Sequence, residues 1–324
     1  MPFLIDGCKV LLHVPAADVA ERIHALLDAG ALVSVLSTQP DAVLRDLSSR
    51  GLIDLVVDVD PLQYDVVLRD RPRRTPSVMG ESAVGGVTLV GGGPGDQGLL
   101  TIAGMQAIRD ADVLVCDRLA PLGALAEAKA DAEVIHVGKI PRGEFTPQEV
   151  INGLLVEHAQ AGRRVVRLKG GDSFVFGRGG EEWNACVAAG VSVRSIPGVS
   201  SSIAAAELVG VPVTHRSLTQ GFIVVSGHVA PADPRNTVDW SALARSGLTI
   251  VVLMGVAVLR DIADALIAAG LGPETPAACI ADASMPSQRS VTATLDTIDR
   301  IAAGASIGPP AVTVIGSVVE ALDR

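Results

Sequence analysis

Residues 87–100, VTLVGGGPGDQGLL, join an apolar run to closely spaced glycines, a pattern that can hold a phosphate-containing ligand. Gly93, Gly95 and Gly98 have the spacing G-x-G-x-x-G, and Asp117 ends the next apolar run, where an acid that binds a ribose is expected. A nicotinamide dinucleotide would use such residues for its pyrophosphate and ribose. The pattern alone leaves two alternatives open, a different nucleotide-like ligand and a strand-to-helix turn without a ligand.

A second segment, residues 163–178, concentrates positive charge. It contains one acid, Asp172, and five basic residues, Arg163, Arg164, Arg167, Lys169 and Arg178. One interpretation is the solvated end of a strand. The other is a site for an anionic ligand, because guanidinium groups pair with carboxylates and phosphates.

Composition excludes several classes of protein. The chain has 324 residues, of which 48% are hydrophobic, so it can form two or three domains with substantial cores. A formal charge of -10 and 2% aromatic residues disfavour a broad nucleic-acid surface. The four cysteines lie far apart, so neither a zinc site nor a disulfide framework is expected, and no metal is predicted.

Apolar stretches are too short to suggest a membrane partner. The longest, residues 250–259, falls well below the roughly 20 residues that span a bilayer. The first residues lack a basic region followed by a long apolar segment, so no secretory signal is expected. We therefore expect a cytoplasmic protein.

Strand-like and helix-like segments alternate along nearly the whole chain, which predicts an α/β fold. Strand-like runs occupy residues 9–14, 32–36 and 54–59, with helical patterns at 16–30 and 40–51. These segments predict a small Rossmann-like domain over residues 1–68. Residues 69–86 are rich in Arg, Pro, Ser and Gly and predict a linker.

Two lobes are predicted after the linker. The first, residues 87–216, has strand-like runs at 87–91, 112–117, 133–138, 164–172 and 191–198, which indicate a parallel sheet. The second, residues 217–324, has such runs at 222–228, 248–255, 276–282 and 310–316. Ligands of parallel sheets bind beyond the carboxyl ends of the strands, and the loops there are dense in Gly, Asp and basic residues. These loops are the candidate site.

Read in order, the loop segments resemble the tetrapyrrole methylase family, particularly its members that methylate uroporphyrinogen III. The matching segments are LVGGGPGD, ADVLVCDRL, VGK, VVRLKGGDSFVFGRGGEE, PGVSS, VPVTHR, SGH, VVLMG and PPAVTVIG. The resemblance implies a two-lobed fold, S-adenosylmethionine as cofactor, a small-molecule tetrapyrrole partner and a homodimer. It also implies methylation at C-2 and C-7 to give precorrin-2 for sirohaem or cobalamin, and makes the dinucleotide match coincidental.

The resemblance assigns roles to two residues near the substrate. Asp117 would act in proton transfer at the tetrapyrrole, and Lys139 would be a proton donor. The residues themselves leave simpler alternatives open. Asp117 could be a helix N-cap, and Lys139 could be a surface lysine.

Further site residues also follow from the resemblance. The cofactor set is Pro94, Gly170, Gly171, Asp172, Val175, Ser200, Ser201, Met254 and Ala283. The candidates to hold the substrate's carboxylates are Arg118, Arg142, Arg178, His215 and Arg216. The chain departs from the family pattern at Phe145, Ser173 and Ala283, where His, Pro and Gly are common. We expect activity with altered affinity.

The first domain resembles the start of the NAD-binding domain of sirohaem synthase. Pro15, Ala16 and Ala17 stand where that domain has a glycine loop. Proline lacks an N–H group and alanine methyl groups prevent close approach, so NAD binding is not expected and the domain is predicted to be a degenerate remnant. Two alternatives to a methyltransferase remain, a nicotinamide oxidoreductase and a catalytically silent tetrapyrrole-binding protein.

Overall fold

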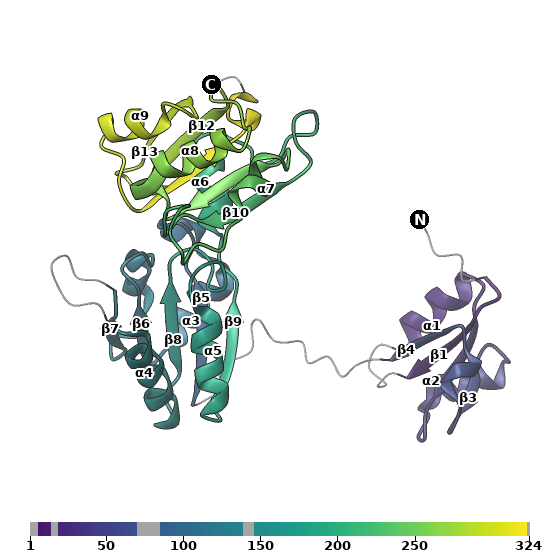
Figure 1. The fold of residues 1–324 in the computed structure, drawn as a ribbon. Helices are drawn as coiled ribbons and strands as arrows, with labels where there is room; N and C mark the ends of the chain where they lie inside the picture. Colours follow the sequence, from purple (N-terminus) through teal and green to yellow (C-terminus); the bar gives the residue numbers. More distant parts are fainter. Residues whose placement is uncertain (1–5, 14–18, 70–84, 139–145, 323–324) are drawn as a thin grey trace. The chain divides into compact units, whose positions relative to one another are not determined.

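Strands form three sheets within the part of the chain that this computed structural model describes, which is residues 6–13, 19–69, 85–138 and 146–322 (Figure 1). The chain divides into two units, Met1–Val78 and Met79–Arg324. Most of the predicted linker and the Pro15-Ala16-Ala17 segment lie outside the described residues.

The first unit contains a four-stranded parallel sheet in the order β3-β2-β1-β4. Its strands are β1 (Lys9–His13), β2 (Leu32–Leu36), β3 (Asp54–Val56) and β4 (Val66–Arg69), with helices α1 (Val19–Asp28) and α2 (Ala42–Ser49). The 3₁₀ helix η2 (Pro61–Gln63) precedes β4. This is the order of the first four strands of a doubly wound fold, so the prediction of a Rossmann-like domain is confirmed. The sequence pattern does not predict β4, whose apolar run is very short.

The first lobe of the second unit is built on a five-stranded parallel sheet in the order β7-β6-β8-β5-β9. Its strands are β5 (Gly86–Gly91), β6 (Val113–Cys116), β7 (Glu133–His136), β8 (Val165–Lys169) and β9 (Ser192–Ile196). Its helices are α3 (Ile102–Asp110), α4 (Gln148–Gln160) and α5 (Gly179–Ala188), with 3₁₀ helices η3 (Gln97–Leu99) and η4 (Leu122–Glu127).

Successive residues of the central strands enter different cores. On β5, Leu89 packs in the cluster that includes residues of α4 and α5, whereas Val90 packs in the cluster that includes residues of α3 and η4. Both faces of the sheet are therefore covered. This coverage explains why the strands read as continuous apolar runs.

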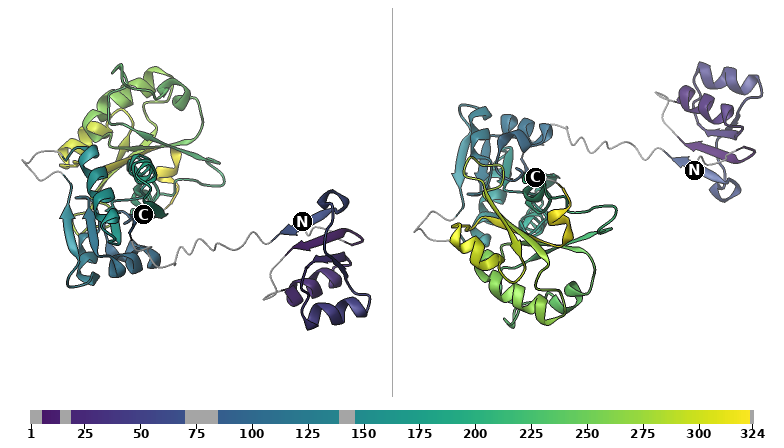
Figure 2. Two further views of the ribbon diagram at one scale, coloured as in Figure 1. Left: turned by 90° about the horizontal axis from the view of Figure 1, so that it is seen from below. Right: turned by 90° about the horizontal axis from the view of Figure 1, so that it is seen from above.

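The second lobe, coloured green to yellow, contains a mixed five-stranded sheet (Figures 1 and 2). The strand order is β10-β11-β14-β12-β13. Its strands are β10 (Phe222–Ser226), β11 (Thr249–Leu253), β12 (Pro276–Ala281), β13 (Arg289–Thr294) and β14 (Ala311–Ile315). Strand β14 runs antiparallel to both of its neighbours, and β13 is antiparallel to β12. The sequence pattern does not predict β13, because its residues, RSVTAT, are mostly small or polar.

Helices also cover both faces of the second sheet. One core includes residues of α7 (Trp240–Ala244), α8 (Leu259–Ala268) and α9 (Ile298–Gly304), beside the short η5 (Val256–Val258). The other includes residues of α6 (Ser201–Glu207) and η6 (Ser317–Glu320). Helix α6 thus belongs to the packing of the second lobe, although it precedes residue 217. The chain passes from one sheet to the other directly after β9.

Candidate functional site

Loops at the carboxyl ends of the first lobe's strands meet the end of β11 around one cleft of about 340 Å³. This volume lies within the range of small-molecule sites, roughly 300–1,000 Å³. The lining residues are Pro94, Asp117, Arg118, Leu119, Gly138, Gly170, Gly171, Asp172, Val175, Phe176, Gly177, Ser200, Ser201, Leu253, Met254 and Pro310. Both lobes of the second unit therefore contribute to the cleft.

Most of the predicted site residues line this cleft. The ten that do so are Pro94, Asp117, Arg118, Gly170, Gly171, Asp172, Val175, Ser200, Ser201 and Met254. Four described residues do not line it, Ala283, Arg178, His215 and Arg216. Lys139, Arg142 and Phe145 lie outside the described residues.

Six lining residues were not predicted, although each lies inside one of the recognised sequence motifs. They are Leu119, Gly138, Phe176, Gly177, Leu253 and Pro310. Their position next to predicted residues was the available signal. Because several are apolar, they form cleft walls that a search for polar or charged groups overlooks.

The glycine loops after β5 and β8 bind each other. The N–H of Gly93 donates to the carbonyl oxygen of Gly171 at 3.1 Å, and the N–H of Gly171 donates to the carbonyl oxygen of Gly93 at 2.7 Å. Gly171 has a φ of 65°, a conformation that favours glycine. At Gly198 a Cβ atom would lie 2.3 Å from the carbonyl oxygen of Gly171. These glycines first serve loop packing, and that packing fixes the floor of the cleft.

Asp172 joins two of these loops. Its Oδ1 accepts a hydrogen bond from the N–H of Phe174 at 2.9 Å, and its Oδ2 accepts one from the N–H of Gly198 at 3.0 Å. Each carboxylate oxygen can accept a further bond. The predicted contact with a cofactor hydroxyl or ammonium group would therefore add to a bracing role in the protein.

Met254 is not a core residue. Its side chain is 48% exposed and lines the cleft. Its φ of 60° is in the left-handed region, which is rare for a residue with a Cβ atom and costs on the order of 1–3 kcal/mol. A strained residue at a cleft is a feature of ligand sites.

Asp117 follows β6 and pairs with buried cations. Its Oδ1 accepts a hydrogen bond from Arg167 Nη2 at 2.5 Å, and its Oδ2 lies 3.8 Å from Lys169 Nζ. The nearby helix η4 has Pro121 as its N-cap residue. The contacts of the Asp117 side chain are therefore those of an ion pair and not those of a helix N-cap. The carboxylate is one end of an ion network.

The five basic residues of segment 163–178 all form ion pairs within the protein. Arg163 pairs with Glu133, Arg164 with Asp112 and Arg178 with Glu181, whereas Arg167 and Lys169 are buried beside Glu182. Burial lowers the pKa of Lys169, as does the charge of Arg167, while Glu182 and Asp117 act in the opposite direction. Arg167 and Lys169 are therefore buried counter-ions, whereas Arg163, Arg164 and Arg178 are partly exposed members of ion pairs.

Arg118 is predicted to bind a substrate carboxylate, and the structure places this arginine in the wall of the cleft. Arg178 donates two hydrogen bonds to Glu181, at 2.8 and 2.6 Å, and Nδ1 of His215 lies 3.0 Å from Ser217 Oγ. Arg216 is exposed. Of the five predicted substrate residues, therefore, the structure brings only Arg118, among those it describes, to the cleft wall.

The two described departures from the family pattern are both buried. Ala283 packs in the core of the second lobe, and the neighbouring Ser284 Oγ accepts a hydrogen bond from the N–H of Asp96 at 2.9 Å. The loop after β12 therefore touches the GGGPGD loop. Ser173 is fully buried, and its hydroxyl has no hydrogen-bond partner among the described residues.

The turn after β5 differs from a dinucleotide-binding turn. Asp96 caps the 3₁₀ helix η3, and α3 begins only at Ile102, with Thr101 as its N-cap. In a dinucleotide fold the pyrophosphate lies at the N-terminus of the helix that directly follows the glycine turn. Here Gly98 is inside η3 and donates its N–H to Asp96 Oδ1.

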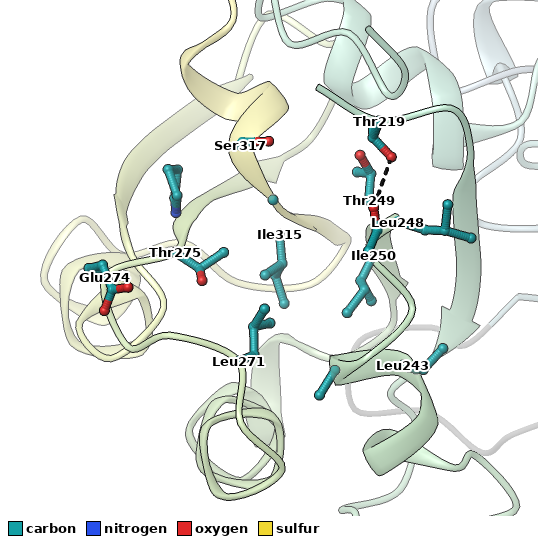
Figure 3. A pocket seen from close by; sticks show the side chains of 14 residues that line it. Thr219, Leu243, Leu248, Thr249, Ile250, Leu271, Glu274, Thr275, Ile315 and Ser317 are labelled. Carbon is teal, nitrogen blue, oxygen red and sulfur yellow. Dashed lines mark hydrogen bonds between the residues drawn. The ribbon is translucent and has the colours of Figure 1, made fainter. Parts of the chain in front are cut away.

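A second cavity, of about 360 Å³, lies at the opposite end of the second sheet (Figure 3). It is lined by the first residues of β11, the end of β14 and apolar side chains that include Leu243, Leu248 and Leu271. None of the described residues predicted for the site lines it.

Across the described residues, no group of three or more His, Cys, Asp or Glu side chains is placed to hold a metal ion. No described helix has the length and apolar character needed to cross a membrane.

Residues 86–299 match the family described as Tetrapyrrole (Corrin/Porphyrin) Methylases, and the chain belongs to this family. A uroporphyrinogen-III C-methyltransferase from Priestia megaterium is 44% identical over 236 residues, which cover 73% of this chain and 99% of that protein. A siroheme synthase from Neisseria meningitidis serogroup B is 46% identical over 235 residues, which cover 72% of this chain and 48% of that protein. The chain thus spans about half the length of the siroheme synthases that it matches.

The fold comparison agrees with the family. The crystal structure of a uroporphyrin-III C-methyl transferase from Thermus thermophilus, complexed with S-adenyl homocysteine, matches with a TM-score of 0.61 and 40% identity. The match covers 73% of this chain and all of that one. The family resemblance and the predicted two-lobed α/β fold are confirmed.

Proposed function

We propose that the chain is an S-adenosylmethionine-dependent C-methyltransferase that converts uroporphyrinogen III to precorrin-2 by methylation at C-2 and C-7. The observation that carries this proposal is the cleft, which gathers residues from both lobes that the family resemblance assigns to cofactor and substrate. The similarity to a uroporphyrinogen-III C-methyltransferase over nearly that protein's full length supports it. The product would serve sirohaem or cobalamin biosynthesis in the cytoplasm.

The groups that line the cleft fit this cofactor. Gly170 and Gly171 offer backbone groups, Ser200 and Ser201 offer hydroxyl groups, and Met254 presents a polarizable thioether suited to an adenine face. When bound, S-adenosylmethionine supplies an electrophilic methyl group on a sulfonium sulfur. Carbon methylation of this kind needs alignment of the reactants and exclusion of water, which a cleft with apolar walls provides.

The chain's own residues would act on the macrocycle. Arg118 would pair with a substrate carboxylate, because a guanidinium group binds carboxylates in bidentate geometry. Asp117, the preceding residue, would accept the proton that leaves when a ring carbon is methylated. The two residues are adjacent in sequence just after β6 and both line the cleft, so these roles would put proton transfer beside a substrate anchor.

A titration tests this assignment of the cleft. S-adenosylhomocysteine, the demethylated cofactor, should bind with one site per chain in isothermal titration calorimetry. The same protein preparation, supplied with labelled S-adenosylmethionine, should transfer labelled methyl groups to uroporphyrinogen III. A chain that binds neither compound would contradict the proposal, and one that binds both without transfer would be a silent tetrapyrrole-binding protein. We also propose a homodimer, for which light scattering should give twice the chain mass of 33.2 kDa.

A further inference from the structure

Four charged side chains form one network beneath the cleft. Arg167 and Lys169 come from β8 and Glu182 from α5, and these three side chains are at most 3% exposed. Asp117, after β6, is 31% exposed and reaches the cleft. Three elements of the first lobe thus connect a buried cluster to one carboxylate at the site.

Glu182 is the inner anchor of the network. Its Oε1 accepts hydrogen bonds from Arg167 Nε at 2.9 Å, from Lys169 Nζ at 3.0 Å and from Gln148 Nε2 at 3.3 Å. Its carboxylate is fully buried. With three donors on one oxygen, Glu182 fixes the positions of both cations.

Arg167 transmits this position to Asp117. While its Nε is held by Glu182, its Nη1 donates to the carbonyl oxygens of Val115 and Leu168, and its Nη2 donates to Asp117 Oδ1 at 2.5 Å. All three guanidinium nitrogens are therefore engaged. The guanidinium group is therefore fixed in place, and its Nη2 in turn sets the position of Asp117 Oδ1.

Charge balance gives Asp117 a second reason to stay in place. The three buried members carry two positive charges and one negative charge, so Asp117 supplies the charge that neutralises the network. Buried ion pairs often stabilise a fold no better than apolar residues of similar size. A network that ends at a site residue is therefore better explained by positioning than by stability.

We propose that Arg167, Lys169 and Glu182 are positioning residues that hold the Asp117 carboxyl group at the cleft in the geometry needed for proton transfer. This inference rests on the proposed methyl transfer. It assigns a use to two of the basic residues that the sequence left unexplained, and it identifies Glu182, in the GRGGEE segment, as part of the same apparatus.

The conservative change Arg167→Lys tests the inference. Lysine keeps the charge, but a single ammonium group cannot reproduce the fork that spans Glu182 and Asp117. We expect kcat to fall by about tenfold or more, since general acid-base groups contribute on the order of 100- to 10,000-fold. The KM for uroporphyrinogen III and the Kd for S-adenosylhomocysteine should stay within about twofold, because neither depends on proton transfer.

Arg164→Lys is the matched control. Arg164 lies just before β8 and pairs with Asp112, and its side chain is 33% exposed. Its replacement should leave kcat near that of the wild-type protein. All assays are run below the thermal midpoint of each variant, so that lost folding does not appear as lost turnover. If Arg167→Lys does not fold, Glu182→Gln, which keeps the size of the side chain, is measured in the same way.

A double-mutant cycle decides whether these residues act through Asp117. If they do, Arg167→Lys combined with Asp117→Asn will be no slower than Asp117→Asn alone, because the same interaction is lost twice. The same result is expected when Glu182→Gln, instead of Arg167→Lys, is combined with Asp117→Asn. Losses that multiply, or unchanged kcat in the single variants, would overturn the inference while an active wild-type protein upholds the proposed function. An inactive wild-type protein would overturn both.

Discussion

Two aspartates flank β6, and their surroundings differ. Asp117 faces the cleft and pairs with buried Arg167, whereas Asp112 pairs with Lys129 and Arg164 at the other end of the strand. If Asp117 were a helix N-cap, Asn could replace it with little loss of stability. Its ion pair with Arg167 gives a different expectation, because the substitution leaves a buried guanidinium without its charged partner.

Asp117→Asn should lower methyl transfer by about 100- to 10,000-fold while the Kd for S-adenosylhomocysteine changes by less than about twofold. The free energy of unfolding should also fall by about 1.5–3 kcal/mol, the usual loss for a hydrogen bond to a charged group. Asp112→Asn is the control, since it should lower stability and leave turnover intact. Labelled methyl transfer and chemical denaturation measure the two effects. Wild-type turnover in Asp117→Asn would remove its assigned role.

Asp112 also predicts how stability depends on pH. Burial alone would raise the pKa of its carboxyl, but hydrogen bonds from Lys129 and from the N–H of Arg164, with the charges of both side chains, lower that pKa to about 2. An unfolded aspartate titrates near pH 4. Its stabilising contribution is therefore complete above about pH 4 and is lost as the pH falls toward 2. The difference in thermal midpoint between wild type and Asp112→Asn should shrink over this range, and a constant difference would argue against the ion pair.

At the scale of elements, the loop after β9 must pass very close to the loop after β8. Gly198→Ala should destabilise the protein by at least about 1–3 kcal/mol, because the new methyl group would meet the backbone oxygen of Gly171. Gly180→Ala is the matched control. That glycine is in α5 with open space around its Cβ position, so alanine should be neutral or stabilising by up to about 1 kcal/mol. Equal denaturation midpoints for the two variants would contradict this packing.

Among the described residues, sequence patterns predicted every strand except β4 and β13, together with the motifs that line the cleft. They missed β4 and β13 because neither has a long apolar run. They also missed the partner of the β8 cations. Arg167 and Lys169 are two residues apart on a central strand, so their side chains lie on the same face of the sheet. Two buried positive charges on one face require counter-ions. Glu182 lies on a different element, so its pairing depends on the tertiary fold.

At the scale of the whole molecule, the second unit holds every residue that lines the cleft. The first unit has the order of the first four strands of a Rossmann fold, but the segment with Pro15, Ala16 and Ala17 is outside the described residues. We predict that it does not support NAD-dependent oxidation, because the proline lacks an N–H group for a pyrophosphate. Absorbance should show no sirohydrochlorin when NAD is added to the protein with precorrin-2. Formation of sirohydrochlorin would show a working oxidoreductase.

Counting the methyl groups transferred tests the central claim most directly. The protein is incubated with uroporphyrinogen III and isotope-labelled S-adenosylmethionine, and the macrocycle is analysed by mass spectrometry. We predict two labelled methyl groups per macrocycle, on C-2 and C-7, with two molecules of S-adenosylhomocysteine formed for each. Uroporphyrinogen III recovered without label, from a folded protein that binds S-adenosylhomocysteine, would contradict the proposed function.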